Sequence, residues 1–294
     1  MVTGLQNTIE KTVLKKKSNT SIENTNNLKL SIQFSLDGFS FCISNLENEK
    51  DELFTEYLFD TQLKTPEALL EEIKPVFKND KNLHLDFKNV NVIYRNNLNS
   101  LVPIAYFDEN NLSQYLNFSI KTLKTDYIAY DTLKNTEANN VYIPYVNINN
   151  YLFQHFGEFE YRHHLSVYID KLIDLNNEKD SKTMYINVDH KSFDIVVLKG
   201  KELLFSNIFS YKTKEDFLYY VLFVAEQLKL DTNSFNLFIS GKINEDSEVF
   251  KLCYKYIRNI KFLESNNSIF NFLEAKRHSN FILLYKQANE NNIW

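Results

Sequence analysis

The first half of the chain alternates apolar and polar residues over three neighbouring stretches, which predicts three short strands. Apolar residues at helical spacing follow, and this stretch begins at a proline directly after a threonine. A compact apolar run then predicts a fourth strand. The predicted elements are strands at 28–35, 39–43 and 53–59, a helix at 66–77 and a strand at 90–94.

The second half repeats this order of elements. Its predicted elements are strands at 184–188, 193–198 and 203–208, a helix at 213–228 and a strand at 235–240. Residues 30–44 align without a gap over residues 184–198, and this alignment places Ser35 opposite Asp189. The identity between the halves is low, so a chance coincidence of two similar meanders is the alternative. The shared order of five elements favours an internal duplication.

The remaining predicted elements lie around these two repeats. Strands are predicted at 126–133, 141–145 and 260–263, and helices at 148–156, 165–175, 247–256 and 272–285. The first 27 residues are polar without a sustained period, which predicts a mobile tail. A polar, charged linker at 176–182 predicts a domain boundary. We therefore expect a tail at 1–27, a first lobe at 28–178 and a second lobe, with a C-terminal helix, at 179–294.

Composition and charge narrow the classes of function. The 294 residues carry a formal charge of −5 and a pI near 5.8, so no basic face for nucleic acid is expected. No stretch approaches the roughly 20 apolar residues that cross a bilayer, and no membrane insertion is expected. Cys42 and Cys253 stand far apart and outside any CxxC pattern, which favours neither a disulfide framework nor a zinc site. A cytoplasmic location is expected.

Short catalytic motifs are missing from the sequence. No GxSxG, HExxH, P-loop or GxGxxG pattern occurs. The adjacent pair His163 and His164 is a candidate for a metal or catalytic site. Adjacent residues on a strand point to opposite faces, so we do not expect the two rings to share a ligand. The motifs therefore assign no catalytic residue and no metal ligand.

Several segments resemble known proteins. The segments VDHKSFDIVVLKGKELLFSNIF and FNLFISGKIN, with a helix between them, are similar to the second lobe of actin-like pilus-assembly proteins. The segments LSIQFSLDGFSFCI, VPIAYFDENNLSQYL, YKTKEDFLYYVLFVAEQL and YIRNIKF resemble an uncharacterised Bacteroidetes family, domain of unknown function 3822. The resemblance implies a mixed α/β (α+β) class and a duplicated actin-like ATPase (ribonuclease H-like) fold. Each of its two lobes has a β-meander followed by a helix and a strand.

An active ATPase of this fold needs acidic residues at strand ends, which hold hydrated Mg²⁺, and glycines in the turns, which let backbone N–H groups reach phosphates. In the first half, Ser35 stands at the strand end where the acid is expected. Asp37 and Gly38 come later, inside the turn. A tight hairpin turn is the simpler interpretation of this pair.

The second half keeps one of the two acids. Asp189 stands at the strand end, and Lys191 and Ser192 occupy the turn where a phosphate-facing glycine is expected. A lysine can contact a phosphate as a point charge, but ordinary solvent exposure explains Lys191 as well. Gly241 is the remaining glycine of the expected adenosine turn, and Lys242 follows it. Three of the four nucleotide elements are changed, and the fourth is half kept.

The resemblance and the changed elements together predict a pseudo-ATPase. Such a protein is a non-catalytic scaffold or interaction protein with an unidentified protein partner and no bound ATP or Mg²⁺. The alternative is a divergent ATP/Mg-binding ATPase or phosphotransferase that uses Asp189 for magnesium. Its nucleotide-binding residues would be Ser35, Asp37, Gly38, Asp189, Lys191, Ser192 and Gly241. A small-molecule module in the cleft between the lobes is a third class. A homo-oligomer is left open.

Overall fold

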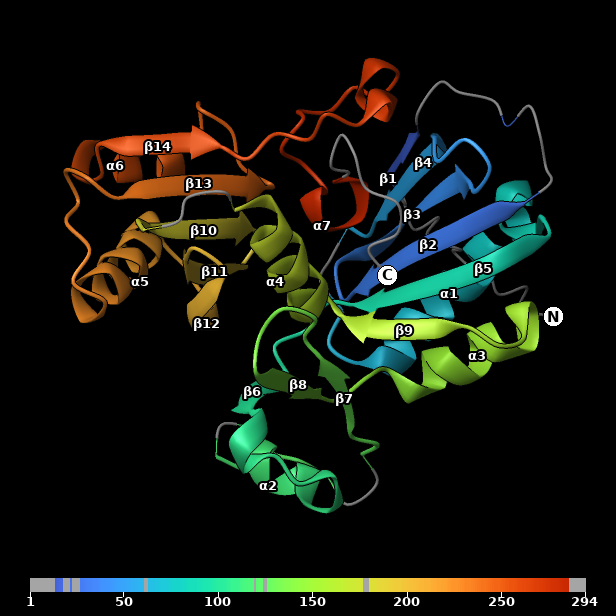
Figure 1. Cartoon of the computed structure of the whole chain (residues 1–294). Coiled ribbons are helices and arrows are strands. Elements are labelled where there is room, and N and C mark those ends of the chain that lie inside the picture. The colour runs from blue at the N-terminus through green and yellow to red at the C-terminus, as the bar shows by residue number, and fades with distance from the viewer. Residues whose placement is uncertain are drawn as a thin grey trace, which may run out of the picture.

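The computed structural model contains two large sheets and one small sheet (Figure 1). It describes residues 14–17, 22, 27–60, 63–118, 120–123, 126–176 and 180–285. Each large sheet forms its own lobe, helices lie between the lobes, and the small sheet projects to one side. Within the described ranges, no helix has both the length and the apolar character needed to cross a membrane.

The first lobe is built on a six-stranded sheet in the order β1-β4-β3-β2-β5-β9. β2, β3 and β4 form an antiparallel meander, and β5 and β9 run parallel to β2. The apolar positions of β2, Leu30, Ile32 and Phe34, are fully buried, as its alternation predicts. The strands are β1 Leu14–Lys17, β2 Leu28–Ser35, β3 Gly38–Asn45, β4 Asp51–Leu58, β5 Phe87–Tyr94 and β9 Glu160–His163.

The second lobe is built on a five-stranded sheet in the order β12-β11-β10-β13-β14. β10, β11 and β12 form an antiparallel meander, and β13 and β14 run parallel to β10. The strands are β10 Lys182–Val188, β11 Ser192–Lys199, β12 Glu202–Ser210, β13 Asn236–Gly241 and β14 Asn259–Phe262.

The two lobes share one topology. In each, the first strand of the meander lies at the centre, the second and third strands lie on one side, and two parallel strands lie on the other. Ser35 is the last residue of β2, and Asp189 directly follows β10, so the two residues hold equivalent positions. The predicted fold class, with a meander, a helix and a strand in each lobe, is confirmed.

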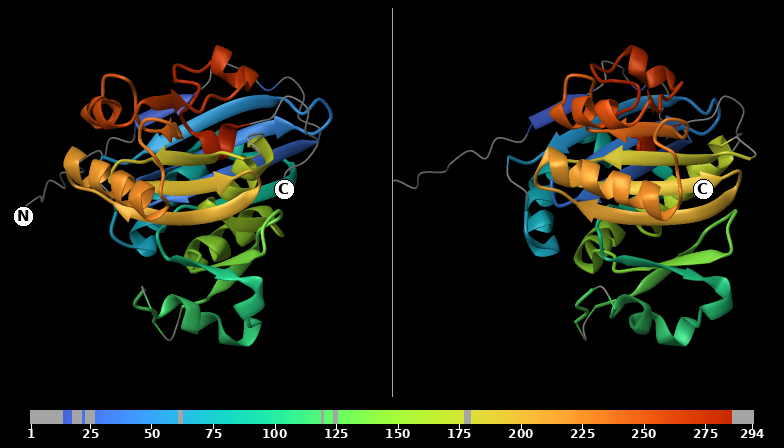
Figure 2. Two further views of the ribbon diagram at one scale, coloured as in Figure 1. Left: turned by 60° about the vertical axis from the view of Figure 1, so that its left-hand side comes forward. Right: turned by 90° about the vertical axis from the view of Figure 1, so that its left-hand side faces the viewer.

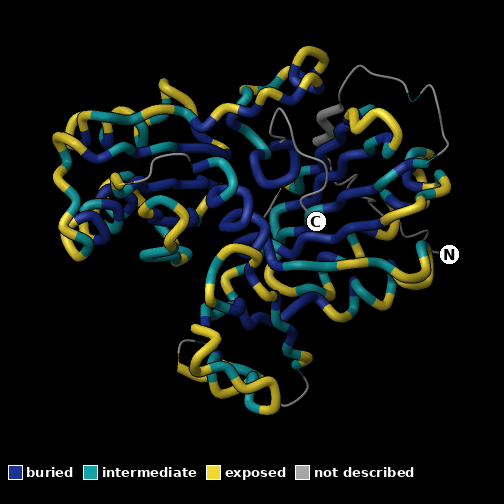
Figure 3. The backbone as a smooth tube through the Cα atoms, viewed as in Figure 1, coloured by how far each residue is buried: buried dark blue, intermediate teal, exposed yellow. Residues whose placement is uncertain are grey.

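Helices cover the sheets and fill the space between the lobes. α1 and α3 pack on the first sheet, and α5 and α6 lie side by side on the second (Figures 1 and 2). α4 and α7 lie between the two sheets, where the backbone is mostly buried (Figure 3). The helices are α1 Pro66–Asn79, α2 Leu112–Leu116, α3 Val146–Phe156, α4 His164–Leu175, α5 Lys214–Gln227, α6 Glu248–Tyr256 and α7 Phe281–Leu284.

A small antiparallel sheet is inserted between β5 and α3, in the order β6-β8-β7. Together with α2 it has its own core, in which Val102, Leu116, Val141 and Ile143 are buried. The sequence pattern predicted two of its strands and missed β6. Its strands are β6 Asn99–Pro103, β7 Ala129–Thr132 and β8 Ala138–Tyr142.

Two predicted segments differ from the structure. The predicted C-terminal helix at 272–285 is wrong: only α7 is α-helical there, and it starts after Asn280, whose φ of 50° ends any helix from the preceding side. Most of the predicted tail at 1–27 lies outside the described residues, but β1 within it pairs antiparallel with β4. The lobe boundary predicted near residue 178 stays a prediction, since residues 177–179 are not described.

The glycine of the β2–β3 hairpin allows β4 to pack closely. Gly38 has φ +151°, and a Cβ there would lie 2.1 Å from the carbonyl oxygen of Tyr57. Backbone cannot yield cheaply, so the position excludes every side chain. Gly157, which ends α3 at φ +74°, has open space around it.

We expect Gly38→Ala to lower the free energy of unfolding by at least about 2 kcal/mol more than Gly157→Ala does, because only the former adds a steric clash to backbone strain. Gly157→Ala alone should cost about 1–3 kcal/mol, because its positive φ lies in a region that residues with a Cβ rarely adopt. Urea denaturation of both variants measures the difference. Equal losses would show that β4 yields to the methyl group.

Candidate functional site

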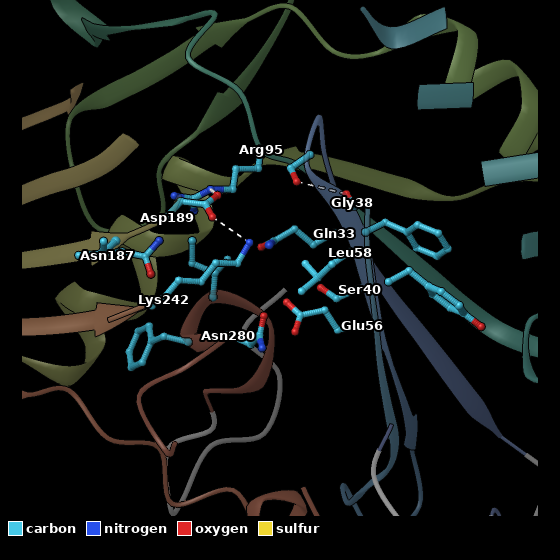
Figure 4. A pocket seen from close by; sticks show the side chains of 17 residues that line it. Gln33, Gly38, Ser40, Glu56, Leu58, Arg95, Asn187, Asp189, Lys242 and Asn280 are labelled. Atoms are coloured by element: carbon cyan, nitrogen blue, oxygen red, sulfur yellow. Dashed lines mark hydrogen bonds and ion pairs between the residues drawn. The ribbon is translucent and has the colours of Figure 1, made fainter. Parts of the chain in front are cut away.

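The strand ends of the two lobes line one small cavity (Figure 4). Ser35 ends β2 of the first lobe, and Asp189 follows β10 of the second. Arg95 directly follows β5, and its side chain reaches from the first lobe to the second. The position of the fold's first strand-end acid is thus next to an ion pair between the lobes.

Both carboxylate oxygens of Asp189 are already in ion pairs. Arg95 Nε lies 2.7 Å from Oδ2, and Lys242 Nζ lies 2.9 Å from Oδ1. The backbone N–H of His190 also donates to Oδ1, at 2.9 Å. A magnesium ion would need an oxygen of this carboxylate as a ligand, either directly or through one of the ion's bound waters. Here Arg95 and Lys242 are paired with both of these oxygens.

A second buried acid, Asp194 on β11, completes the network. Arg95 Nη2 lies 3.2 Å from its Oδ2, and Asn187 donates to the same oxygen at 2.9 Å. His164, the first residue of α4, has Nε2 at 3.0 Å from Oδ1. The Asp194 side chain is fully buried, and that of Arg95 is only 9% exposed. Two acids, an arginine and a histidine therefore share one nearly dry site.

The acidic and basic groups of this network stabilise each other's charged forms. Burial acts to raise the pKa of the Asp194 carboxyl, but Arg95 and His164 outweigh it and hold that pKa at about 2. Burial also opposes the charge of Asp189, and Arg95 and Lys242 reverse this and hold its pKa well below the usual range. Burial opposes the charge of Arg95 as well, yet the two acids raise its pKa. The ionised network is thus stable at neutral pH.

The two glycines expected to face nucleotide pack against backbone instead. A Cβ on Gly241 would lie 2.1 Å from the carbonyl oxygen of Val188, so the glycine is needed for β13 to pass β10. Gly38 is needed in the same way beside β4. Both line a cavity of about 40 Å³. Ligand pockets measure roughly 300–1,000 Å³, so this cavity has room for water and not for adenosine.

A larger pocket of about 330 Å³ lies beside the ion pairs. Its lining includes Asp37, Lys191, Ser192 and Lys212 from the turns of both lobes. Ser35 also lines it, but its hydroxyl stays in its own turn, where it donates to Gly38 O at 3.2 Å and accepts from the N–H of Asp37 at 3.3 Å. This pocket brings together most of the residues expected to bind nucleotide.

Asp37 is the acid of this pocket that has no ion pair in the described part of the chain. Burial is the main reason why its pKa is raised, and the charge of Asp189 adds to the effect. Lys242, His190 and Arg95 lower the pKa and only partly compensate. Among the three aspartates that line the pocket, Asp37 is therefore the one whose charge is least compensated by the protein.

The structure brings Ser35, Asp37 and Asp189 to one pocket together with Lys191 and Ser192, and nucleotide binding by these residues stays a prediction. The other residues of the site were not predicted from the sequence. Arg95, His164 and Asp194 were not assigned to it, and Lys242 was noted only as the residue after Gly241. One signal was visible: Asp194 interrupts an otherwise apolar strand, and a buried acid needs a cationic partner. Its partner could not be found, because Arg95 belongs to the other lobe.

Two lobes of one topology, with their hairpin turns facing each other, define the actin-like ATPase fold. The chain belongs to the family described as protein of unknown function (DUF3822), whose model matches residues 17–260. A solved structure from Bacteroides thetaiotaomicron VPI-5482, a protein with actin-like ATPase fold and unknown function, is similar. Its TM-score is 0.74 at 23% identity, over 81% of this chain and 91% of that chain.

The fold extends to a more distant neighbour. The structure of a PilM–PilN type IV pilus biogenesis complex matches with a TM-score of 0.54 at 11% identity, over 80% of this chain and 88% of that chain. A search among curated proteins found no match. These likenesses establish the fold and the family, and the family's description assigns no activity.

We expect Arg95→Met to lower the free energy of unfolding by about 3–5 kcal/mol, because it leaves two buried carboxylates without their shared cation. In the double variant Arg95→Met/Asp194→Asn, the loss should be smaller than the sum of the single losses. Urea denaturation measures the cycle. Lys214→Met breaks an exposed ion pair with Glu248 and should cost less than about 1 kcal/mol. Additive losses at Arg95 and Asp194 would contradict the coupling.

The depressed pKa of Asp194 predicts how stability depends on acid. Ionised Asp194 makes its full contribution to the free energy of unfolding above its unfolded-state pKa near 4. This contribution is lost as the pH falls towards its folded-state pKa of about 2. Asp194→Asn should therefore flatten the fall in unfolding free energy below pH 4, by up to about 1.4 kcal/mol per pH unit. Urea denaturation between pH 5 and pH 2.5 tests this. The exposed control Asp246→Asn should keep the wild-type slope.

Proposed function

We propose that this chain is a non-catalytic member of the actin-like fold, which acts by binding a partner protein and not by hydrolysing a nucleotide. The observation that carries the proposal is the occupation of Asp189 by Arg95 and Lys242. A magnesium ion would have to displace two cations from a nearly buried carboxylate. The electrostatic need that Mg²⁺ meets in an ATPase is met here by the protein itself.

The packing around the glycines supports the same proposal. Gly38 and Gly241 are explained by close backbone approach, and the cavity between them is about 40 Å³. The two glycines therefore leave no room for an adenosine in the cavity that they line, which supports a fold that has kept its architecture without its nucleotide chemistry. Function has to be argued from sites and not from the fold.

A partner protein is the class of ligand that this proposal assigns to the chain. The matched chain of similar fold comes from a PilM–PilN type IV pilus biogenesis complex, an assembly of different proteins. By analogy of fold alone, this chain would also present its lobes to another polypeptide. A cytoplasmic location belongs to this proposal, since Cys42 and Cys253 are buried cysteines in different lobes, as in a reducing compartment.

One observation favours a second candidate, a divergent ATP/Mg-dependent enzyme. The pocket of about 330 Å³ contains Asp37, Lys191 and Lys212, and Asp37 has no ion pair in the described part of the chain. In this alternative, Asp37 and Asp189 hold the metal and Lys191 contacts a phosphate. It requires the ion pairs of Asp189 to open when nucleotide binds.

Thermal unfolding with and without millimolar Mg-ATP separates the two candidates. The proposal predicts a shift in melting temperature below about 1 °C. A nucleotide present at a hundredfold excess over its Kd would stabilise the native state by about 2.7 kcal/mol, or several degrees. A clear shift that Asp37→Asn and Lys191→Ala abolish, and that Lys255→Ala keeps, would replace the proposal by the ATPase.

A further inference from the structure

A surface groove lies on the outer side of the first lobe, away from the central ion pairs. α1 and α3 run across the same face of the sheet (Figure 1), and the 3₁₀ helix Lys81–His84 follows α1. Between these elements is a groove of about 550 Å³. Its size is within the range of binding pockets, which is roughly 300–1,000 Å³.

The floor of the groove is a cluster of aromatic rings. Phe77 of α1 is 1% exposed, and its ring contacts Tyr151 edge to face at 5.6 Å and Phe156 at 6.1 Å between centroids. Tyr151 and Phe156 both belong to α3, so the floor joins the two helices. Rings held this way form a preorganised apolar surface, which loses little entropy on binding.

The rim of the groove is basic. Lys74 and Lys78, one turn apart on α1, line it, and no aspartate or glutamate is among the lining residues. Lys74 pairs with Glu71 at 2.7 Å, whereas Lys78 has no ion pair among the described residues. The whole chain carries a formal charge of −5, so the rim of the groove is opposite in sign to the net charge of the protein.

Two histidines add hydrogen-bonding groups to the same groove. His84 Nε2 lies 2.6 Å from the carbonyl oxygen of Phe77, and His155 Nδ1 lies 3.0 Å from that of Tyr151. In each ring the second nitrogen has no hydrogen-bond partner in the described part of the chain. These nitrogens are available to a polar backbone laid along the groove.

We propose that the groove between α1 and α3 binds a short acidic segment of a partner protein, anchored by an aromatic or large aliphatic side chain. The rings of Tyr151 and Phe156, supported from below by the buried ring of Phe77, receive the anchor. Lys78 pairs with the flanking carboxylates. An apolar floor inside a charged rim is the usual anatomy of a protein interface. The inference rests on the proposed function and specifies the chemistry of the partner.

The aromatic floor and the two lysines of α1 together favour this partner over other anions. Inorganic phosphate would use the lysines but gain nothing from the rings. Nucleic acid would need a broader basic face than two lysines on a chain of net negative charge provide. An acidic peptide with an apolar anchor uses both features.

A display selection of random octapeptides against the full chain tests the proposal, with Lys78→Glu as the counter-target. We expect enrichment of peptides in which Asp or Glu flanks Trp, Phe or Leu. Their synthetic forms should bind Lys78→Glu at least tenfold more weakly than the unchanged protein, by fluorescence anisotropy. Lys255→Glu is the matched control, because Lys255 is also an exposed lysine in the last turn of a helix, α6, and this variant should bind unchanged.

A second variant tests the floor. Tyr151→Ser should weaken the same peptides at least fivefold, while its thermal unfolding shows whether the fold is kept. Binding that loses its aromatic preference and is competed by millimolar inorganic phosphate would reveal an anion site and overturn the proposal. Failure to enrich acidic peptides over the Lys78→Glu counter-selection would also overturn it. In either case the proposed function stands unless Mg-ATP stabilises the chain.

Discussion

The guanidinium of Arg95 binds two carboxylates of the opposite lobe, and all three side chains are at most 9% exposed. Asp189 and Asp194 sit on either side of it, and each also has a second cationic or hydrogen-bonding partner. A buried arginine with two acids is costly to separate, since each lost partner leaves a charge in a medium of low dielectric. The relative position of the two lobes at their strand ends therefore depends on this contact.

This contact also decides the chemistry of the cleft. In an actin-like ATPase the cleft is charged for a metal and a polyphosphate, and the protein leaves those charges for the ligand to balance. Here Arg95 and Lys242 balance the strand-end acid from within the chain. Gly38 and Gly241 allow neighbouring strands to approach each other closely, since a Cβ at either position would clash with backbone.

The proposed function places recognition on the outer faces of the lobes. The groove between α1 and α3 combines aromatic rings with lysines, and it is built on the same helices that stabilise the first sheet. Phe77 has both roles, since it is part of the core of that lobe and part of the groove floor. A binding surface supported by the core in this way is rigid, and it does not need the lobes to move.

The sequence by itself determined the order of strands and helices, because the signals for these elements are local, and the resemblance of whole segments then implied the actin-like fold. Alternation of apolar residues, the Asp37-Gly38 turn and the spacing of 66–77 specify strands, a hairpin and a helix from neighbours in the chain. The doubled order of elements then gave the two lobes. The C-terminal helix at 272–285 was wrong for the same reason: Leu273 and the apolar residues 281–284 are buried, but only 281–284 have α-helical backbone.

Only the tertiary structure decided what the site contains. Arg95 and Asp189 are 94 residues apart, and no periodicity relates a residue after β5 to one after β10. The sequence placed Asp189 at a strand end, but whether its oxygens face a metal or a protein cation depends on which side chains the other lobe brings to it. An ion pair between the lobes forms only when both sheets have packed against each other, because its two residues are distant in the sequence.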